Sequence, residues 1–235
     1  MNELISSIEK LKSRPIGKQI RDRMAEFRSK GKQGENEIFK ELCFCILTAN
    51  YSAEGGMRVQ EAVGNRFITL PEAALAKQLK SLGYRFPNIR AKYVVSARNY
   101  KSDLCVLLAS NPAPNLDQNS NPGQKTLREW IVKHIHGLGY KEASHFLRNI
   151  GYGSLAIIDF HILELLERNN LIKKQSAHSH STSSSSQSVS KSRSVSKRRY
   201  LEIEQLLSKI AIKTKMSLGE LDLYLWYVET GKVLK

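Results

Sequence analysis

The stretch that decides the fold is Val132-Lys-His-Ile135-His-Gly137-Leu138-Gly139-Tyr-Lys141-Glu-Ala143-Ser-His-Phe146-Leu147. Two glycines flank one apolar residue, and apolar positions on both sides recur at helical spacing. Because glycine has no Cβ, Gly137 and Gly139 permit a tight turn between two helices. Leu138 can then drop between the helices, and the small Ala143 lets them approach closely. The stretch predicts two helices joined by a short hairpin at about residues 127–150.

This pattern is the helix–hairpin–helix of sequence-independent DNA-binding proteins. The exposed amides of the hairpin and the N-terminus of the second helix form a cradle for one DNA phosphate. We therefore predict that Gly137 and Gly139 contact the DNA backbone. Taken alone, the motif also fits a module that holds DNA without altering it, because a lysine beside such a hairpin is more often a phosphate contact than a nucleophile.

The charge of the chain agrees with a polyanionic partner. The 235 residues carry a formal net charge of +15 at pH 7. Seven of these charges lie in residues 173–199, which contain no acid, so the rest of the chain is basic by itself. Such an excess is typical of proteins that bind nucleic acid, the alternative being a basic but inert surface.

Several classes of protein are excluded by the composition. Cys43, Cys45 and Cys105 are too few for a disulfide framework or for the four thiolates of an iron–sulfur cluster. The longest apolar run, Leu42 to Leu47, is too short to span a bilayer, and the N-terminus does not read as a signal peptide. We expect an intracellular monomer located with the DNA, with no metal, cofactor, iron–sulfur cluster or membrane contact.

The periodicity of the chain predicts an all-α fold. Stretches with apolar residues at helical spacing are 35–49, 73–82, 91–100, 200–210 and 218–228. The turn-rich segment 83–88 separates two of them, and the segment 111–123, with three prolines, is expected to be a loop. No region alternates polar and apolar residues over a sustained length, so no sheet is expected.

One segment interrupts the helical pattern. Residues 176–196 contain twelve serines and almost no large apolar side chains, so they cannot bury enough surface to offset the entropy of ordering. We expect a disordered, basic, serine-rich insertion at 174–198, which divides one helical domain into 1–173 and 199–235. A tolerated surface loop is favoured over a phosphorylated segment or a tether that attracts DNA.

A second motif lies eighteen residues after Lys141. It reads Ala156-Ile-Ile-Asp159-Phe160-His161-Ile-Leu163, an acid that follows an apolar run and opens a helix. In isolation such an acid is best explained as a helix N-cap. Together, the hairpin lysine and the downstream aspartate match the signature of the helix–hairpin–helix glycosylase superfamily.

The resemblance extends over nearly the whole chain outside the insertion. The segments that carry it, all similar to the archaeal-type (type 2) 8-oxoguanine DNA glycosylase/AP lyases, are 46–56, 85–90, 137–163 and 225–235. It implies two helical subdomains flanking a DNA-binding cleft, with duplex DNA containing 8-oxoguanine as the substrate. It also implies that the enzyme excises the damaged base and nicks the strand.

The resemblance assigns roles to single residues. It makes Lys141 the Schiff-base nucleophile, Asp159 the catalytic carboxylate and His161 a contact to a phosphate. It places the carboxylate of the C-terminal Lys235 at the damage pocket. Phe160 departs from the pattern, because a basic residue is expected directly after the aspartate.

The chemistry explains why these residue types are needed. Breaking a glycosidic bond develops positive charge on the sugar, which a nearby carboxylate stabilises. A neutral amine can attack C1′, and the resulting Schiff base permits β-elimination. Because the base is inaccessible inside a duplex, it must be flipped out, and an aromatic side chain must stack on it or fill the gap. Phe86, Tyr84 and Trp226 are the candidates, although aromatic residues at helical spacing are more often part of a core.

Three rival functions remain open at the level of the sequence. The first is a glycosylase of the same fold that removes another oxidised or mispaired base. The second is a non-catalytic helix–hairpin–helix module. The third is an RNA-associated basic protein with a serine/arginine-like tract, which leaves the pair of Lys141 and Asp159 unexplained.

Overall fold

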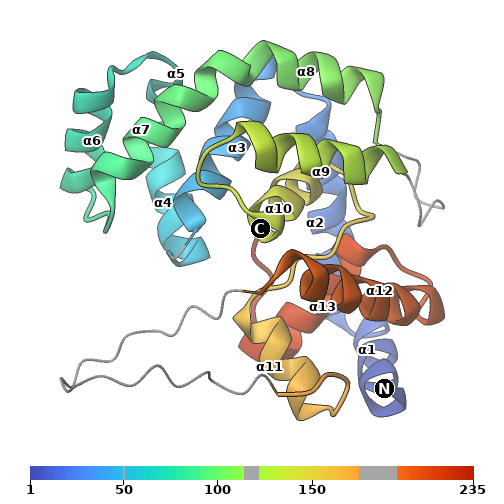
Figure 1. Cartoon of the computed structure of the whole chain (residues 1–235). Helices are drawn as coiled ribbons and strands as arrows, with labels where there is room; N and C mark the ends of the chain where they lie inside the picture. Colours follow the sequence, from blue (N-terminus) through green and yellow to red (C-terminus); the bar gives the residue numbers. More distant parts are fainter. Residues whose placement is uncertain (50, 114–121, 175–194) are drawn as a thin grey trace.

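The computed structural model describes residues 1–49, 51–113, 122–174 and 195–235, and these ranges form helices without any strand. The elements, shown in Figure 1, are α1 (Asn2–Lys12), α2 (Pro15–Gly31), α3 (Glu35–Thr48), α4 (Ala53–Val63), α5 (Arg66–Thr69), α6 (Glu72–Ser81), α7 (Pro87–Ala97), the 3₁₀ helix η1 (Arg98–Tyr100), α8 (Lys101–Ser110), α9 (Pro122–His134), α10 (Tyr140–Asn149), α11 (Phe160–Arg168), α12 (Lys197–Lys213) and α13 (Leu218–Thr230). The predicted all-α class is confirmed.

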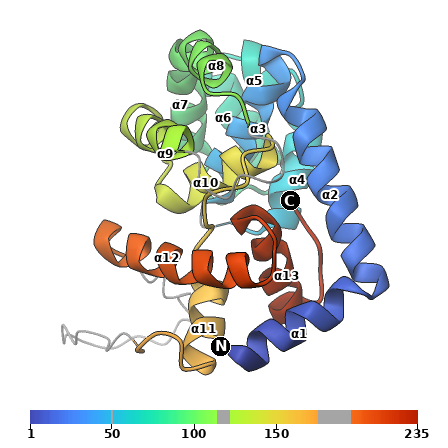
Figure 2. The ribbon, with the colours of Figure 1, turned by 90° about the vertical axis from the view of Figure 1, so that its right-hand side faces the viewer.

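The helices pack around two separate apolar cores. The first core takes its residues from the chain between Ile38 and Leu155, and thus from α3 to α10. The second core joins α1 and α2 to the part of the chain that follows Ala156, including α12 and α13. Figures 1 and 2 show the two groups of helices one above the other, with α2 running along both. The two predicted helical subdomains are confirmed, and the chain passes between them at residues 155–156.

The hairpin between α9 and α10 has the predicted packing. Leu138 and Ala143 are buried in the first core. Gly137 has a φ of 84°, and a Cβ at this position would lie 2.4 Å from the ring of Tyr93. Gly139, in contrast, has a φ of −94° and serves as the N-cap of α10. Only one of the two glycines is therefore required by the backbone conformation.

The segment 155–158, which leads to α11, is held by α12. The hydroxyl of Tyr200 donates to the carbonyl of Ala156 (2.7 Å) and accepts from the amide of Ile158 (3.3 Å). A carboxylate oxygen of Glu204 accepts from the amide of Ala156 (3.0 Å). Because the segment has no helical hydrogen bonds of its own, these side chains satisfy its backbone and fix the start of α11.

The helix boundaries differ from the predicted ones at three places. The helix predicted to start at residue 91 begins at Pro87, inside the segment assigned to a turn, because proline is favourable in the first turn of a helix. The predicted loop 111–123 ends at Pro122, where α9 begins. The expected insertion 174–198 extends too far, since Ser196 caps α12 by accepting from the amide of Arg199 (3.3 Å).

The other residues predicted to form loops, 114–121 and 175–194, lie outside the described ranges. Within the described part of the chain, no helix is both long and apolar enough to cross a membrane. The same part contains no cluster of three or more histidine, cysteine or acidic side chains able to hold a metal ion.

Candidate active site

Lys141 lies in the first turn of α10, directly after the hairpin, and its side chain is about one-third exposed. Its Nζ is 3.3 Å from a carboxylate oxygen of Glu142. The other oxygen of Glu142 accepts a hydrogen bond from the amide of Gly139 (3.2 Å). The predicted phosphate-binding amide is therefore already bonded to an acidic side chain, and a phosphate must displace Glu142 to reach it.

Asp159 is the N-cap of α11, where its Oδ1 accepts from the amide of Ile162 (2.9 Å). Burial raises the pKa of the Asp159 carboxyl, while the amide of Ile162 and the positive charge of Lys141 act in the opposite direction. Since the charge of Lys141 acts on this carboxyl, the two groups share one region at the junction of the subdomains. Lys141 reaches it from α10 and Asp159 from the start of α11.

A buried ion pair lies in the same region and was not predicted from the sequence. Arg148 of α10 pairs with Asp222 of α13, and both side chains are buried. Burial raises the pKa of Asp222 to about 7, and the charges of Asp159 and Lys141 both act on this carboxyl. The one local signal is that Asp222 is an acid within the apolar run Leu221 to Leu225.

Three aromatic rings continue from Asp159 toward α13. The ring of His161 lies 3.7 Å from that of Phe160 and meets the ring of Trp226 edge-on, at 4.8 Å between centroids. The buried Nε1 of Trp226 has no hydrogen-bond partner among the described residues. Phe160 is 51% exposed, which leaves a large apolar surface beside the catalytic candidate Asp159. The structure thus brings Trp226 and His161 together with Asp159.

The C-terminus reaches the same helix as Lys141. Burial lowers the pKa of His145, one turn after Lys141 on α10, and the charges of Lys141 and Lys235 and the main chain of Lys235 lie near enough to act on this pKa. Figures 1 and 2 place the chain end beside α10, between the two groups of helices. Lys235 is therefore held in the structure, in contrast to the fraying that is usual at chain ends.

The other aromatic candidates are less directly connected to this region. Phe86 lies at the start of α7, with the guanidinium of Arg85 4.9 Å from the centre of its ring, and no described contact joins it to Lys141 or Asp159. Tyr84 belongs to the first core, where its hydroxyl donates to the carbonyl of Leu47 (2.6 Å).

Basic residues in the ordered part of the chain, among them Arg85, Arg90, Lys92 and Arg98, are candidates for phosphate contacts. Two of these arginines have structural partners instead. Arg90 is buried and donates to the carbonyl of Ala49 (2.8 Å). Arg98 donates to the carbonyl of Phe67 (2.9 Å). Each guanidinium thereby satisfies a main-chain carbonyl within the first subdomain.

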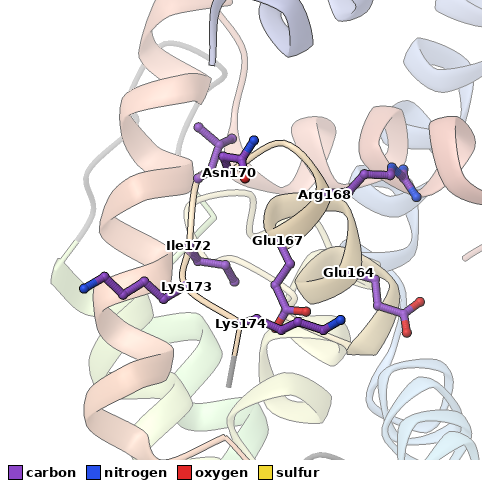
Figure 3. Close-up of a pocket in the computed structure, with 8 residues that line it drawn as sticks. Glu164, Glu167, Arg168, Asn170, Ile172, Lys173 and Lys174 are labelled. Carbon is purple, nitrogen blue, oxygen red and sulfur yellow. The ribbon is translucent and has the colours of Figure 1, made fainter. Parts of the chain in front are cut away.

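Two cavities are considered, one at the far end of α11 and one beside Asp222, and neither forms a ready pocket for a purine at the candidate site. A hollow of about 760 Å³ lies at the C-terminal end of α11 (Figure 3), the opposite end of this helix from Asp159. Its lining mixes the acids Glu164 and Glu167 with the bases Arg168, Lys173 and Lys174, and it contains none of the predicted site residues. A second cavity, beside Asp222, has a volume of about 10 Å³, which is room for one water molecule. A flipped base can enter beside Asp222 only if the junction opens.

These features define a class of protein. A helix–hairpin–helix carries a lysine at the junction of two helical subdomains, and the half-buried carboxylate of Asp159, from the second subdomain, lies near enough for the charge of this lysine to act on it. This arrangement is that of the helix–hairpin–helix DNA glycosylases, which combine a DNA-binding hairpin with an amine and a carboxylate for attack at the sugar.

Comparison with known proteins specifies the family. The sequence profile of the 8-oxoguanine DNA glycosylases matches residues 20–216. A protein of Methanocaldococcus jannaschii named 8-oxoguanine DNA glycosylase/AP lyase is 45% identical over 232 residues, covering 99% of each chain. A protein of Korarchaeum cryptofilum with the same name is 43% identical over 235 residues, covering 100% of this chain and 99% of its own. The chain belongs to the 8-oxoguanine DNA glycosylase family.

Solved structures agree with this assignment. The M. jannaschii 8-oxoguanine glycosylase/lyase, crystallised with a 15mer DNA containing 8-oxoguanine, superposes with a TM-score of 0.84 at 44% identity, covering 99% of this chain and all of the other. The 8-oxoguanine DNA glycosylase of Thermotoga maritima gives a TM-score of 0.82 at 37% identity, covering 100% of this chain and 99% of the other. The predicted family and fold are confirmed.

Proposed function

We propose that the protein excises 8-oxoguanine from duplex DNA and nicks the strand, with Lys141 as nucleophile and Asp159 as the stabilising carboxylate. The observation that carries the proposal is the placement of Lys141 directly after the hairpin and of Asp159 at the start of α11, near enough for the charge of Lys141 to act on the Asp159 carboxyl. The enzyme acts as a monomer, in the cell where the DNA is, and needs no metal or organic cofactor. Its relatives carry the name 8-oxoguanine DNA glycosylase/AP lyase, which supports this substrate.

The reaction proceeds in two stages. The neutral amine of Lys141 bonds to C1′ of the deoxyribose as the bond from C1′ to the base breaks, and the base leaves with the electron pair and takes up a proton. Asp159 stabilises the positive charge that develops on the sugar. The amine then forms a Schiff base as the sugar ring opens, and loss of a proton from C2′ expels the 3′ phosphate.

Recognition uses the groups around this pair. The amide of Gly137 and, once Glu142 has moved, that of Gly139 bind one phosphate, and His161 contacts the backbone beside Asp159. The carboxylate of Lys235 accepts the N7–H that 8-oxoguanine has and guanine lacks. A site built to bond an N–H discriminates against an analogue without it by roughly 10⁴ or more. Trp226 stacks on the flipped base, and Phe86 fills the gap that the base leaves in the duplex.

Borohydride trapping tests the proposal. On a duplex containing 8-oxoguanine the protein is expected to form a covalent adduct, and an undamaged duplex is expected to give none. Lys141→Gln removes the nucleophile and should abolish the adduct. Asp159→Asn should keep lesion binding but lose about 10²-fold or more in turnover, as expected for an electrostatic stabiliser of the transition state. Adduct formation by Lys141→Gln, or full turnover by Asp159→Asn, excludes the assigned role.

A further inference from the structure

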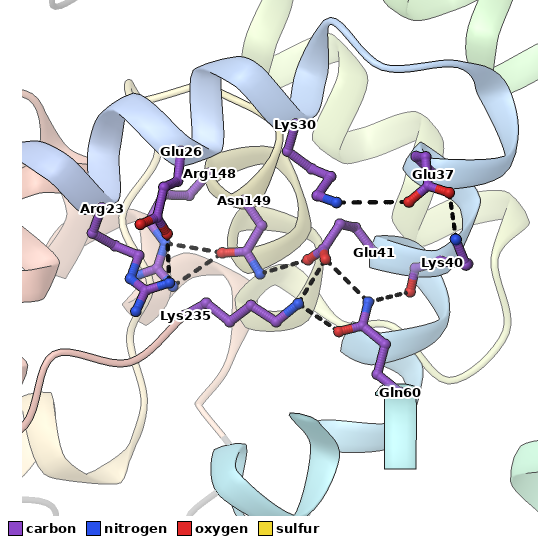
Figure 4. A network of polar contacts seen from close by, with 10 residues as sticks. All are labelled: Arg23, Glu26, Lys30, Glu37, Lys40, Glu41, Gln60, Arg148, Asn149 and Lys235. Carbon is purple, nitrogen blue, oxygen red and sulfur yellow. Dashed lines mark hydrogen bonds and ion pairs between the residues drawn. The ribbon is translucent and has the colours of Figure 1, made fainter. Parts of the chain in front are cut away.

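A buried carboxylate on α3 is the centre of a polar network that reaches the end of the chain (Figure 4). Glu41 is 2% exposed. Its Oε1 accepts from the ammonium of Lys235 (2.6 Å) and from the amide of Gln60 (3.0 Å), and its Oε2 accepts from Asn149 (3.3 Å). A carboxylate so deeply buried requires partners of this kind, since an unpaired buried charge is strongly destabilising.

The same network holds the side chain of Lys235 from several directions. Its ammonium donates to the side-chain oxygen of Gln60 as well as to Glu41, and it lies 4.5 Å from the centre of the Phe44 ring. The side chain is 17% exposed. A terminal lysine usually has many rotamers and a frayed backbone. Here, two hydrogen bonds and a ring restrict the side chain to one position.

The network also joins the helix that carries Lys141. Asn149, at the end of α10, accepts from the guanidinium of Arg148 (3.1 and 3.3 Å), and Arg148 pairs with Asp222 of α13. The main chain of Lys235 lies near enough to His145, on the same helix, to act on its pKa. The side chain of Lys235, through Glu41 and Asn149, is thus connected to the end of α10, and its main chain lies near His145, one turn from Lys141.

We infer that Glu41 is a positioning residue for recognition of the lesion, acting through the side chain of Lys235. The inference rests on the proposed role of the C-terminal carboxylate. An acceptor that distinguishes one N–H must be held to within about 0.5 Å, and a chain end has no following residue to hold it. The ion pair of Glu41 with the ammonium supplies this restraint from the other end of the same residue.

The test separates recognition of the base from the lyase chemistry. Glu41→Gln keeps the shape of the side chain but removes the charge that pairs with Lys235. Excision of 8-oxoguanine under single-turnover conditions should fall by about 10- to 10²-fold, the effect of misplacing a binding group by about 1 Å. Cleavage of a preformed abasic site, which contains no base to recognise, should be unchanged. Equal loss of both activities assigns Glu41 a merely structural role and overturns the inference.

Lys235→Met provides a second route should Glu41→Gln fail to fold. It retains the terminal carboxylate and the apolar stem but removes the ammonium. It should reproduce the selective loss of excision, and the double variant Glu41→Gln/Lys235→Met should be no worse than either single variant. Losses that multiply in the double variant, or a Lys235→Met protein with full excision, overturn the inference.

Glu37, on the same helix as Glu41, provides a matched control, and deletion of Lys235 tests the role of the chain end directly. Glu37 lies one turn earlier on the same helix and pairs at the surface with Lys40 and with Lys30 (3.7 Å). The variant Glu37→Gln should therefore leave both activities unchanged.

Deleting Lys235 tests the proposed function itself. Full excision by the deletion variant refutes the role of the terminus and the inference with it. Loss of excision in the deletion variant, with full excision in Glu41→Gln, refutes the inference alone.

Discussion

At the scale of the residue, Asp159 combines two roles that the sequence presented as alternatives. It caps α11 through the amide of Ile162, and the charge of Lys141 acts on its carboxyl. The N-cap interpretation is thus correct, and it does not compete with a catalytic role. The capping hydrogen bond fixes the position of the carboxylate, so it is already oriented before the substrate arrives.

The raised pKa of Asp159 predicts a specific dependence of the reaction on pH. Because burial favours the protonated form, the carboxylate is lost on acidification at a higher pH than for an ordinary aspartate, whose pKa is about 3.9. The single-turnover rate of base excision should therefore fall in acid with a midpoint above about 3.9. His161→Gln serves as the control, because the charge of the neighbouring imidazole acts on the Asp159 carboxyl. If the acid limb disappears in His161→Gln, Asp159 is not its source.

The position of Phe160 permits a prediction about the salt dependence of DNA binding. This side chain is 51% exposed at the start of α11, at the place where a basic residue is expected. Phe160→Arg should add one phosphate contact and steepen the slope of log K against log salt by about 0.9, as measured by titration of a duplex at several salt concentrations. Val106→Arg adds the same charge at a position on α8 that is 68% exposed and should leave the slope unchanged. Equal steepening in both variants indicates general charge rather than a contact at residue 160.

At the scale of the element, α12 connects the two segments that carry Lys141 and Asp159. Arg128 of α9 makes two hydrogen bonds to Glu204 of α12 (2.6 and 2.9 Å), and both side chains are almost completely buried. Arg128 also lies 4.7 Å from the centre of the ring of Tyr140, the residue before Lys141. Glu204 bonds the amide of Ala156, three residues before Asp159. One ion pair thereby braces both sides of the site.

Removing one partner of this ion pair should strongly destabilise the fold. Glu204→Gln leaves the guanidinium of Arg128 buried without its counter-charge, so the free energy of unfolding should fall by about 3 to 5 kcal/mol in denaturant titrations. Glu202→Gln, on the same helix, breaks only surface ion pairs with Arg198 and Arg199 and should change it by less than about 1 kcal/mol. If the two variants are equally stable, the ion pair does not brace the site.

How much of the fold and the site can be predicted from the sequence depends on how far apart in the chain the interacting residues lie. The hairpin was predicted because its signal is local: glycine, an apolar residue and a small residue within a few positions of Gly137. The roles of Lys141 and Asp159 were predicted only from the resemblance to a family and stay a prediction. Glu41 and the ion pair of Arg128 with Glu204 were missed, because their partners lie far away in the chain and no local pattern marks them.

At the scale of the whole molecule, the site lies where the two cores meet. Lys141 and Arg148 belong to a helix of the first core, whereas Asp159 and Asp222 belong to the part of the chain that builds the second. Two buried ion pairs, Arg128 with Glu204 and Arg148 with Asp222, join the subdomains. Because such pairs depend on good geometry, they favour one relative orientation of the subdomains.

We predict that the connection between α11 and α12 can be shortened without changing how the two subdomains pack together. The guanidinium of Arg199 donates to the carbonyl of Lys173 (3.2 Å), so the chain on the two sides of residues 175–194 is already close together. Replacing these residues with a short glycine–serine linker should leave single-turnover excision unchanged and alter the free energy of unfolding by only about 1 kcal/mol, since each halving of a loop changes the closure term by about 0.6 kcal/mol. The full-length double variant Lys191→Ser/Arg193→Ser is the control for the charge that the replacement removes. If the linker protein loses excision and this control does not, the segment has a role in the reaction beyond its charge, and the surface-loop interpretation is wrong.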